Sequence, residues 1–417
     1  MIIQHKIFNS RLVLFSSVIL VLSFLIYLAF QNPWRMHLIV DLGFYYRVVY
    51  AFFQNISFGI IPENSYLPGA LFFFLIPGIS LLIKNYDWQS FILSFIVINS
   101  ILILMHLYFY RKYSTLSPFI FLAILLFSGP IFFFRHDLFT SLVLIISFFL
   151  WKYDKRNLSA LGLGVATSIK NFPFLIFPYY LMLSFKEGGK KELIKITAFY
   201  FLGLMIVFAP YLLLGSPISE ISASLQYNAD KPVHIESSWA SLITILHKSF
   251  NNYWITGEEN GGIFGLKYNF NIVPLFFYNY FWLLPLSIFY LLIYKKIFLI
   301  KTLNTLRIEV IFLTILLFEI FSKILAPQYL FWFLPLFPLF YWKTEKKILL
   351  ITSFILILTI VLMTQFIYPL HYNDLLWNFY TNGTDVQYFN ILAVRNVFLI
   401  LLFILVYKLT FSTESKT

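Results

Sequence analysis

The stretch LVLFSSVILVLSFLIYLAF, Leu12 to Phe30, carries no charged side chain. At about 1.5 Å of rise per residue, an apolar helix of this length is long enough to cross the hydrocarbon core of a bilayer. Lys6 and Arg11 precede it, but the apolar run is too long for a secretory signal peptide and no small-residue cleavage site follows. We therefore expect an uncleaved first span with its amino end in the cytoplasm.

The composition of the whole chain matches that first stretch. Of its 417 residues, 60% are hydrophobic, 21% aromatic and 12% charged, whereas soluble domains carry about 25% charged residues. We therefore expect lipid to be the solvent for most of the chain. The chain contains no cysteine, which excludes disulfides, thiolate nucleophiles and cysteine-ligated metal sites.

About twelve membrane spans account for the apolar segments and for the loop charges between them. Basic clusters at 111–112, 152–156, 186–195, 295–307 and 343–347 share one side of the membrane if the spans alternate, as the positive-inside rule requires. The predicted spans are 12–30, 89–110, 116–134, 137–151, 157–170, 172–185, 195–214, 272–294, 305–322, 326–342, 347–369 and 389–409.

The apolar segment 66–83 does not fit this alternation, because a crossing there would put 111–112 on the wrong side. It contains Pro68-Gly69 and Pro77-Gly78, which are helix-breaking pairs. We expect a re-entrant or interfacial helical element packed against protein, where a broken helix is tolerated at membrane depth. Both termini are then cytoplasmic.

The side outside the cytoplasm carries the longer loops, 31–88, 215–271 and 370–388. About two thirds of the lysines and arginines fall on the cytoplasmic side, so the net charge of +12 reflects topology and no nucleic-acid partner is expected. Long loops in a compact protein are usually functional. We treat 1–417 as a single integral membrane domain, all-α, that works on its extracytoplasmic face.

Short groups of polar residues on this face can carry chemistry, and each also has a purely structural interpretation. Asp41 with Tyr45 and Tyr46 suits an interfacial helix as well as a catalytic acid. Arg135-His136-Asp137 lie between two spans. Single charges at such positions commonly snorkel to the surface, but three in succession are less ordinary.

Two further groups lie at predicted helix ends. Lys170 is at the turn between two short helical segments, where a buried lysine usually faces a cavity and binds an anion; the alternative is snorkelling. Glu319 and Lys323 are spaced i,i+4 and are expected to pair on one helix face, which is also compatible with a purely structural role. Gln328 and Tyr329 open the next span.

Taken in order, these segments resemble the GT-C superfamily of membrane glycosyltransferases, and most closely its polyprenyl-phosphate-mannose-dependent mannosyltransferases. Each motif is short and degenerate, so the resemblance rests on the ordered set, which covers most of the chain. The motifs are D-x-x-x-Y-Y at 41–46, Y-x-P at 66–68, Arg135 with Asp137, G-x-A-x-x-x-K-x-x-P at 164–173 and S-K-x-x-x-P-Q-Y-x-x-W-x-x-P at 322–335.

The resemblance implies a GT-C fold and transfer of a sugar, mannose by family default, from a polyprenyl-phosphate donor to a hydroxyl of a lipid or glycan acceptor. Asp41 is the implied catalytic base. The implied donor-phosphate ligands are Lys170, Arg135 and Lys323, with His234 and His371 in reserve, and the implied substrate contacts are Tyr45, Tyr46, Tyr66, Asp137, Gln328 and Tyr329. No second acid stands beside Asp41, so we expect no metal or other cofactor, and inversion at the anomeric carbon.

Two other classes of protein remain as alternatives. A flippase or transporter of lipid-linked sugars predicts matching broken helices in both halves, and one such hairpin is found, at 157–185. A polymerase or ligase of surface polysaccharide would rely on loop arginines, and 215–271 contains none. The expected location is a bacterial cytoplasmic membrane, and the pattern does not predict an oligomeric state.

Because the chain lacks cysteine, a single introduced cysteine reports the side of the membrane. Tyr86→Cys should react in intact cells with a maleimide that does not cross membranes. Tyr113→Cys should react only after permeabilisation. The reverse pattern would restore 66–83 as a span and overturn the topology.

Overall fold

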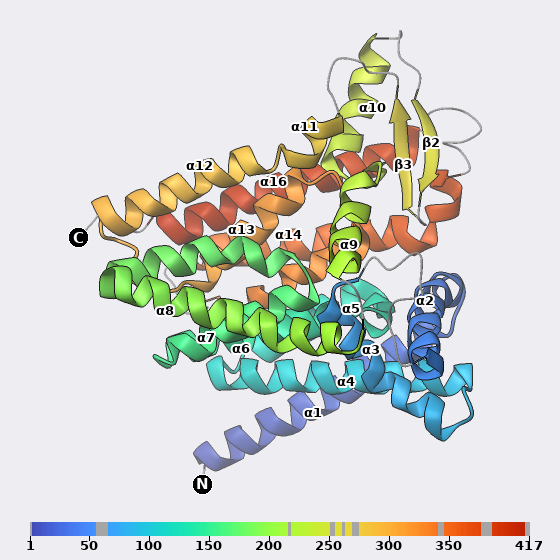
Figure 1. Ribbon diagram of the computed structural model, residues 1–417, viewed down its shortest axis with the longest axis horizontal. Helices are drawn as coiled ribbons and strands as arrows, with labels where there is room; N and C mark the ends of the chain where they lie inside the picture. Colours follow the sequence, from blue (N-terminus) through green and yellow to red (C-terminus); the bar gives the residue numbers. More distant parts are fainter. Residues whose placement is uncertain are drawn as a thin grey trace.

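Helices build almost the whole of the computed structural model, which describes residues 2–55, 66–215, 218–250, 255–260, 263–268, 275–340, 346–376 and 386–412 (Figure 1). The α-helices are α1 (Ile2–Ala29), α2 (Trp34–Asn55), α3 (Pro68–Ile83), α4 (Trp88–Tyr113), α5 (Ser117–Ser128), α6 (Asp137–Lys152), α7 (Arg156–Ile169), α8 (Phe177–Leu213), α9 (Ile218–Asp230), α10 (Ser238–Phe250), α11 (Leu275–Tyr280), α12 (Leu283–Tyr294), α13 (Ile308–Phe321), α14 (Lys347–Gln365) and α16 (Val386–Phe411). Shorter 3₁₀ and π turns are η1 (Gly129–Phe134), η2 (Phe172–Ile176), η3 (Lys295–Leu299), η4 (Pro327–Trp332), η5 (Leu334–Leu339) and η6 (Phe366–Leu370).

Six helical segments of the described chain are long and apolar enough to cross a membrane, so the protein is an integral membrane protein. They are Arg11–Ala29, Trp88–Tyr113, Ser117–Phe134, Phe172–Leu213, Lys347–Leu370 and Tyr388–Phe411. The segment Phe172–Leu213 contains two predicted spans, because Gly189 leaves the helical conformation with φ of 61° and turns the chain. The remaining predicted spans are shorter helices, and the count of twelve stays a prediction.

The long helices α1, α4, α8, α12 and α16 run along the long axis of the molecule (Figure 1). The amino end of α1 and the carboxyl end of α16 lie at the same end of this bundle. At the opposite end lie α2, α9 and α10 together with a small sheet. We call this opposite end the loop end.

The sheet at the loop end is the part of the fold that the predicted all-α class missed. Its strands β1 (Val233–His234), β2 (Ile255–Asn260) and β3 (Ile263–Tyr268) are antiparallel, in the order β1-β3-β2. A strand of two residues carries no readable alternation of polar and apolar side chains. Parts of the predicted loops 31–88, 215–271 and 370–388 lie outside the described residues.

The segment 66–83 differs from its expected broken form. It is a continuous α-helix, α3, with Pro68 in its first turn, where the missing N–H costs nothing, and with Pro77 inside it. Pro77 and Gly78 are buried in its packed face, so neighbouring protein supports the irregularity. At 16 residues it is shorter than the roughly 20 that a span needs. That it does not cross the membrane stays a prediction.

The predicted span 326–342 forms no α-helix in its described part. Residues Pro327–Trp332 and Leu334–Leu339 form two successive 3₁₀ turns. Pro327, Pro335 and Pro338 each lack the N–H that an α-helix needs. Almost all of this segment is buried between other helices, so its irregular backbone is surrounded by protein.

Helices α7 and α8 approach each other closely at two glycines. A Cβ on Gly164 would lie against the carbonyl oxygen of Tyr200 and 3.0 Å from the backbone nitrogen of Leu204. A Cβ on Gly203 would lie against the carbonyl oxygen of Leu161. These glycines let the two backbones touch and hold the end of α7, which carries Lys170, against the bundle.

Gly164→Ala should therefore separate α7 from α8 and destabilise the protein by about 1–3 kcal/mol, the usual cost of overpacking. The measurement is the thermal unfolding temperature in detergent. Gly162→Ala is the matched control, because its new Cβ would lie 3.4 Å from Ser147 Cβ, an ordinary contact. Equal unfolding temperatures for the two variants would contradict this account of the packing.

Candidate functional site

A cavity of about 1090 Å³ opens at the loop end, between the membrane helices and the segment that follows α9. Its wall is assembled from α2, from the η1–α6 and α7–η2 turns, from η4 and from the segment 229–236. All five of these pieces carry residues that the sequence singles out. The cavity therefore joins groups from as far apart in the chain as Val40 and Leu376.

Two ion pairs connect these pieces across the cavity wall. Arg135 pairs with Asp41, and Lys170 pairs with Asp137. The partners come from different segments in each pair, although Arg135 and Asp137 are neighbours in sequence. Each acid therefore pairs with a cation from another element. The pairing offsets the free-energy penalty of burying these charges.

The ammonium of Lys170 lies in an aromatic corner. Its Nζ is 5.0 Å from the ring centre of Trp332 and 5.3 Å from that of Tyr329. Trp332 also donates a hydrogen bond of 2.6 Å to Asp137 Oδ1, the oxygen that Lys170 contacts. Asp137 and the rings favour the charged ammonium, so this corner holds a buried ion pair flanked by aromatic rings.

Asp41 is the acidic group of the wall that water reaches best. Its side chain is 22% exposed, whereas that of Asp137 is 2% exposed. Burial raises the pKa of the Asp41 carboxyl above its ordinary value, and the charge of Arg135 opposes that rise. A carboxylate with a raised pKa is a stronger base, which suits proton transfer near neutral pH.

The segment between α9 and α10 is buried throughout 231–237 and closes one side of the cavity. Lys323 holds it from the membrane side. The ammonium of Lys323 donates hydrogen bonds to the carbonyl oxygens of Ala229, at 2.6 Å, and of Lys231. In return the backbone N–H of His234 donates to the carbonyl of Lys323 at 2.9 Å.

His234 has the protonation state of a structural residue. Burial lowers its pKa to about 4, so the ring is neutral at pH 7. Its Nδ1 lies 2.8 Å from the carbonyl oxygen of Leu325 and must carry the proton, which leaves Nε2 without one. A neutral ring of this tautomer has no second N–H to donate to a phosphate.

Most of the site residues predicted from sequence border this one cavity. Those in its wall are Asp41, Tyr45, Tyr66, Arg135, Asp137, Lys170, His234, Lys323, Gln328 and Tyr329. Tyr46 and His371 are not among its lining residues. Tyr46 donates a hydrogen bond of 2.8 Å to the carbonyl of Tyr86, and His371 Nδ1 lies 3.0 Å from Asp374 Oδ2.

The chain matches no protein-family model and no curated protein in the comparisons. The site is therefore interpreted from its own residues.

The predicted pair of Glu319 with Lys323 is wrong. Helix α13 ends at Phe321, and Ser322 has an extended backbone with ψ of 143°, so Lys323 leaves the helix and the i,i+4 geometry is lost. Lys323 contacts the 229–231 backbone instead. Both carboxyl oxygens of Glu319 are buried without a hydrogen-bond partner among the described residues.

Among the residues of the wall that were not predicted as site residues are Trp332, Tyr368, Lys231 and Glu236. Trp332 belongs to the motif at 322–335, and that motif could have signalled it. Tyr368 is in a π turn at the end of a predicted span. A single tyrosine in such an apolar segment cannot be recognised as a site residue from sequence. Lys231 and Glu236 belong to a loop whose folding against the helices has no periodic signature.

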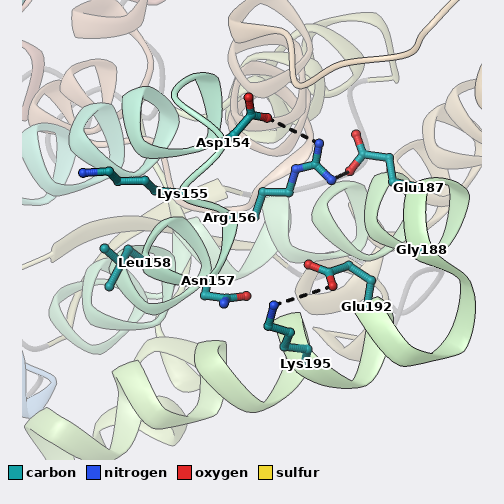
Figure 2. A pocket seen from close by; sticks show the side chains of 9 residues that line it. All are labelled: Asp154, Lys155, Arg156, Asn157, Leu158, Glu187, Gly188, Glu192 and Lys195. Atoms are coloured by element: carbon teal, nitrogen blue, oxygen red, sulfur yellow. Dashed lines mark hydrogen bonds and ion pairs between the residues drawn. The ribbon is translucent and has the colours of Figure 1, made fainter.

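A second hollow, of about 630 Å³, lies between the α6–α7 turn and the kink in α8 (Figure 2). It joins two basic clusters that the sequence places on the cytoplasmic side. Figure 2 shows Arg156 between Asp154 and Glu187, with which it forms ion pairs. Lys195 lies 3.8 Å from Glu192. Its acids and bases neutralise one another, so we interpret it as the link between two turns.

Lys323→Met should release the segment 229–234 from the membrane helices, because both carbonyl contacts of its ammonium are lost. Hydrogen–deuterium exchange of purified protein in detergent should rise in peptides covering 229–234. Lys195→Met, which removes a lysine beside the second hollow, should leave that exchange unchanged. Equal exchange in Lys323→Met and the unmodified protein would show that Lys323 does not hold this segment.

Proposed function

We propose that the protein is a membrane glycosyltransferase of the GT-C type. It transfers a sugar, with mannose favoured, from a polyprenyl-phosphate donor to a hydroxyl of a lipid or glycan acceptor. The observation that carries the proposal is the cavity at the loop end, where the partly exposed carboxylate Asp41 and the cations Arg135, Lys170 and Lys323 border one space.

In the proposed reaction Asp41 acts as the general base. The acceptor oxygen forms a bond to the anomeric carbon while the bond from that carbon to the phosphate oxygen breaks, and the acceptor proton passes to Asp41. The raised pKa of Asp41 supports this role. Attack by the acceptor, with no covalent intermediate, inverts the anomeric carbon, and we propose that no metal takes part.

The leaving phosphate needs cations, because negative charge grows on it as the bond breaks. Arg135 is suited to this role because its Nε is buried without a hydrogen-bond partner among the described residues. Lys170 keeps its ammonium beside two stacked aromatic rings at the cavity wall. Asp137 Oδ2 is likewise buried and unpartnered, and we assign it a hydroxyl of the substrate.

The polyprenyl chain is proposed to lie along the apolar part of the same cavity. That wall is formed by aromatic and aliphatic side chains of η2, α8 and α13, among them Phe174, Phe208 and Phe318. An isoprenoid tail gains free energy there in proportion to its buried area. We place the cavity on the extracytoplasmic face of a bacterial cytoplasmic membrane, with both termini in the cytoplasm.

Asp41→Asn should lower the rate of sugar transfer at least 100-fold, the lower limit of what a general base contributes. Transfer from polyprenyl-phosphate mannose to an alkyl mannoside is measured in proteoliposomes with EDTA present, because no metal is proposed. The asparagine keeps the size of the side chain and can still accept a hydrogen bond from Arg135.

Asp87→Asn is the matched control. Asp87 is an exposed carboxylate that caps α4 by accepting from the backbone N–H of Ser90 at 2.7 Å, and asparagine caps helices equally well. This variant should keep full activity and the same unfolding temperature. Undiminished transfer by Asp41→Asn would remove Asp41 as the base.

A further inference from the structure

Glu236 is a second carboxylate at the cavity wall, on the side formed by the segment 231–237. Its side chain is fully buried, and only one of its two oxygens is engaged. Oε2 accepts a hydrogen bond of 2.9 Å from Arg395 Nη1. Oε1 is buried with no hydrogen-bond partner among the described residues.

Arg395 and Asn396, within α16, hold this glutamate firmly. Arg395 donates through Nη2 to the carbonyl oxygen of Glu236, and through Nε to Asn396 Oδ1 at 3.2 Å. Asn396 Nδ2 contacts the same carbonyl at 3.3 Å and Ser241 Oγ at 2.8 Å. The carboxyl group therefore cannot turn without breaking a network that joins α16 to α10.

An unpartnered oxygen in such a network has a cost. A buried acceptor that lacks a donor destabilises the folded protein by about 1–3 kcal/mol, and more when it is charged. Native proteins seldom keep such a group unless a ligand or water satisfies it. The hydrogen bonds around Glu236 engage its carbonyl oxygen and Oε2 and leave Oε1 without a donor among the described residues, so Oε1 is the position that a ligand would complete.

The chemistry of this position selects a hydroxyl group. Burial raises the pKa of the Glu236 carboxyl to about 7, against the charge of Arg395. Above that pH the group is ionised and is an acceptor only, so its ligand must donate a hydrogen bond. A phosphate would be repelled, and the lysines at 170, 231 and 323 offer it a better place on the same wall. Glu236 borders the same cavity as Asp41, Arg135 and Tyr368.

We propose that Glu236 binds a sugar hydroxyl through Oε1, and that Arg395 and Asn396 are the positioning residues that aim it. The assignment rests on the proposed sugar transfer, since it assumes that a sugar enters this cavity. The hydroxyl belongs either to the sugar on the lipid donor or to a sugar acceptor. Both offer the same chemistry, and the experiment distinguishes them.

Glu236→Gln is the informative variant because it changes one atom. The amide oxygen can take the place of Oε2 and accept from Arg395, and the amide N–H₂ then takes the place of Oε1. An acceptor becomes a donor while the backbone contacts of Arg395 are kept. An unchanged unfolding temperature in detergent establishes that the network survives, and Glu236→Asp serves in its place if the temperature falls.

The measurement is binding, followed by quenching of tryptophan fluorescence, since Trp332 lies in the cavity wall. The probes are polyprenyl-phosphate mannose and its four monodeoxy analogues, and octyl mannoside with the same analogues. For the unmodified protein, removal of one particular hydroxyl should weaken binding at least tenfold. For Glu236→Gln, the intact and deoxy forms of that probe should bind equally.

If Glu236→Gln loses discrimination in the polyprenyl-phosphate mannose series, the hydroxyl belongs to the donor. If it loses discrimination in the octyl mannoside series, the hydroxyl belongs to the acceptor. If both proteins discriminate equally among all the analogues, or neither discriminates, Glu236 binds no sugar hydroxyl and the proposal is overturned. Because binding is measured without sugar transfer, the experiment can refute the hydroxyl site at Glu236 and the proposed transferase activity independently. Loss of discrimination in Glu236→Gln without any sugar transfer would refute the transferase and leave the hydroxyl site standing.

Discussion

The pairing of buried charges at the loop end is the constraint on which the site depends. A charge in a region of low dielectric is tolerated only with a partner and hydrogen bonds. Asp41–Arg135, Asp137–Lys170 and Glu236–Arg395 meet this condition, and each pair joins segments that are distant in sequence. The ion pairs thus decide which segments meet, and the cavity is the space that they enclose.

The same constraint explains why the irregular parts of the chain gather around the cavity. The α7–η2 turn and the 3₁₀ turns of η4 leave backbone groups that lipid cannot satisfy. The η4 turns are largely buried inside the bundle. Nearby, Lys323 supplies hydrogen bonds to the 229–231 backbone. Helices exposed to lipid, such as α1, need no such support, since their backbone groups are paired within the helix.

The membrane character of the chain and the helices exposed to lipid could be predicted from sequence, because apolar length decides them. The segments Arg11–Ala29 and Trp88–Tyr113 show this. Partners across segments could not be predicted. The sequence places Arg135 beside Asp137, yet the fold pairs them with Asp41 and Lys170.

The spacing of residues along a predicted helix fails to predict side-chain contacts where the helix ends earlier than the sequence pattern suggests. Glu319 and Lys323 have the spacing of a helical pair, but α13 ends at Phe321. Polar site residues within apolar surroundings, such as Asp41 inside α2 and Lys170 at the end of α7, could be predicted from their unusual character. Glu236 could not be assigned, because its partner Arg395 is 159 positions away and no periodicity connects the two.

The three carboxylates of the cavity differ in the one property that separates a base from a binding group. A base must release its proton after each reaction, so it needs contact with water. The side chain of Asp41 is 22% exposed, whereas those of Asp137 and Glu236 are 2% and 0% exposed. Sealed carboxylates exchange protons poorly but hold hydroxyl groups rigidly. The division of labour that we propose, with proton transfer at Asp41 and hydroxyl binding at Asp137 and Glu236, follows from this difference in access to water.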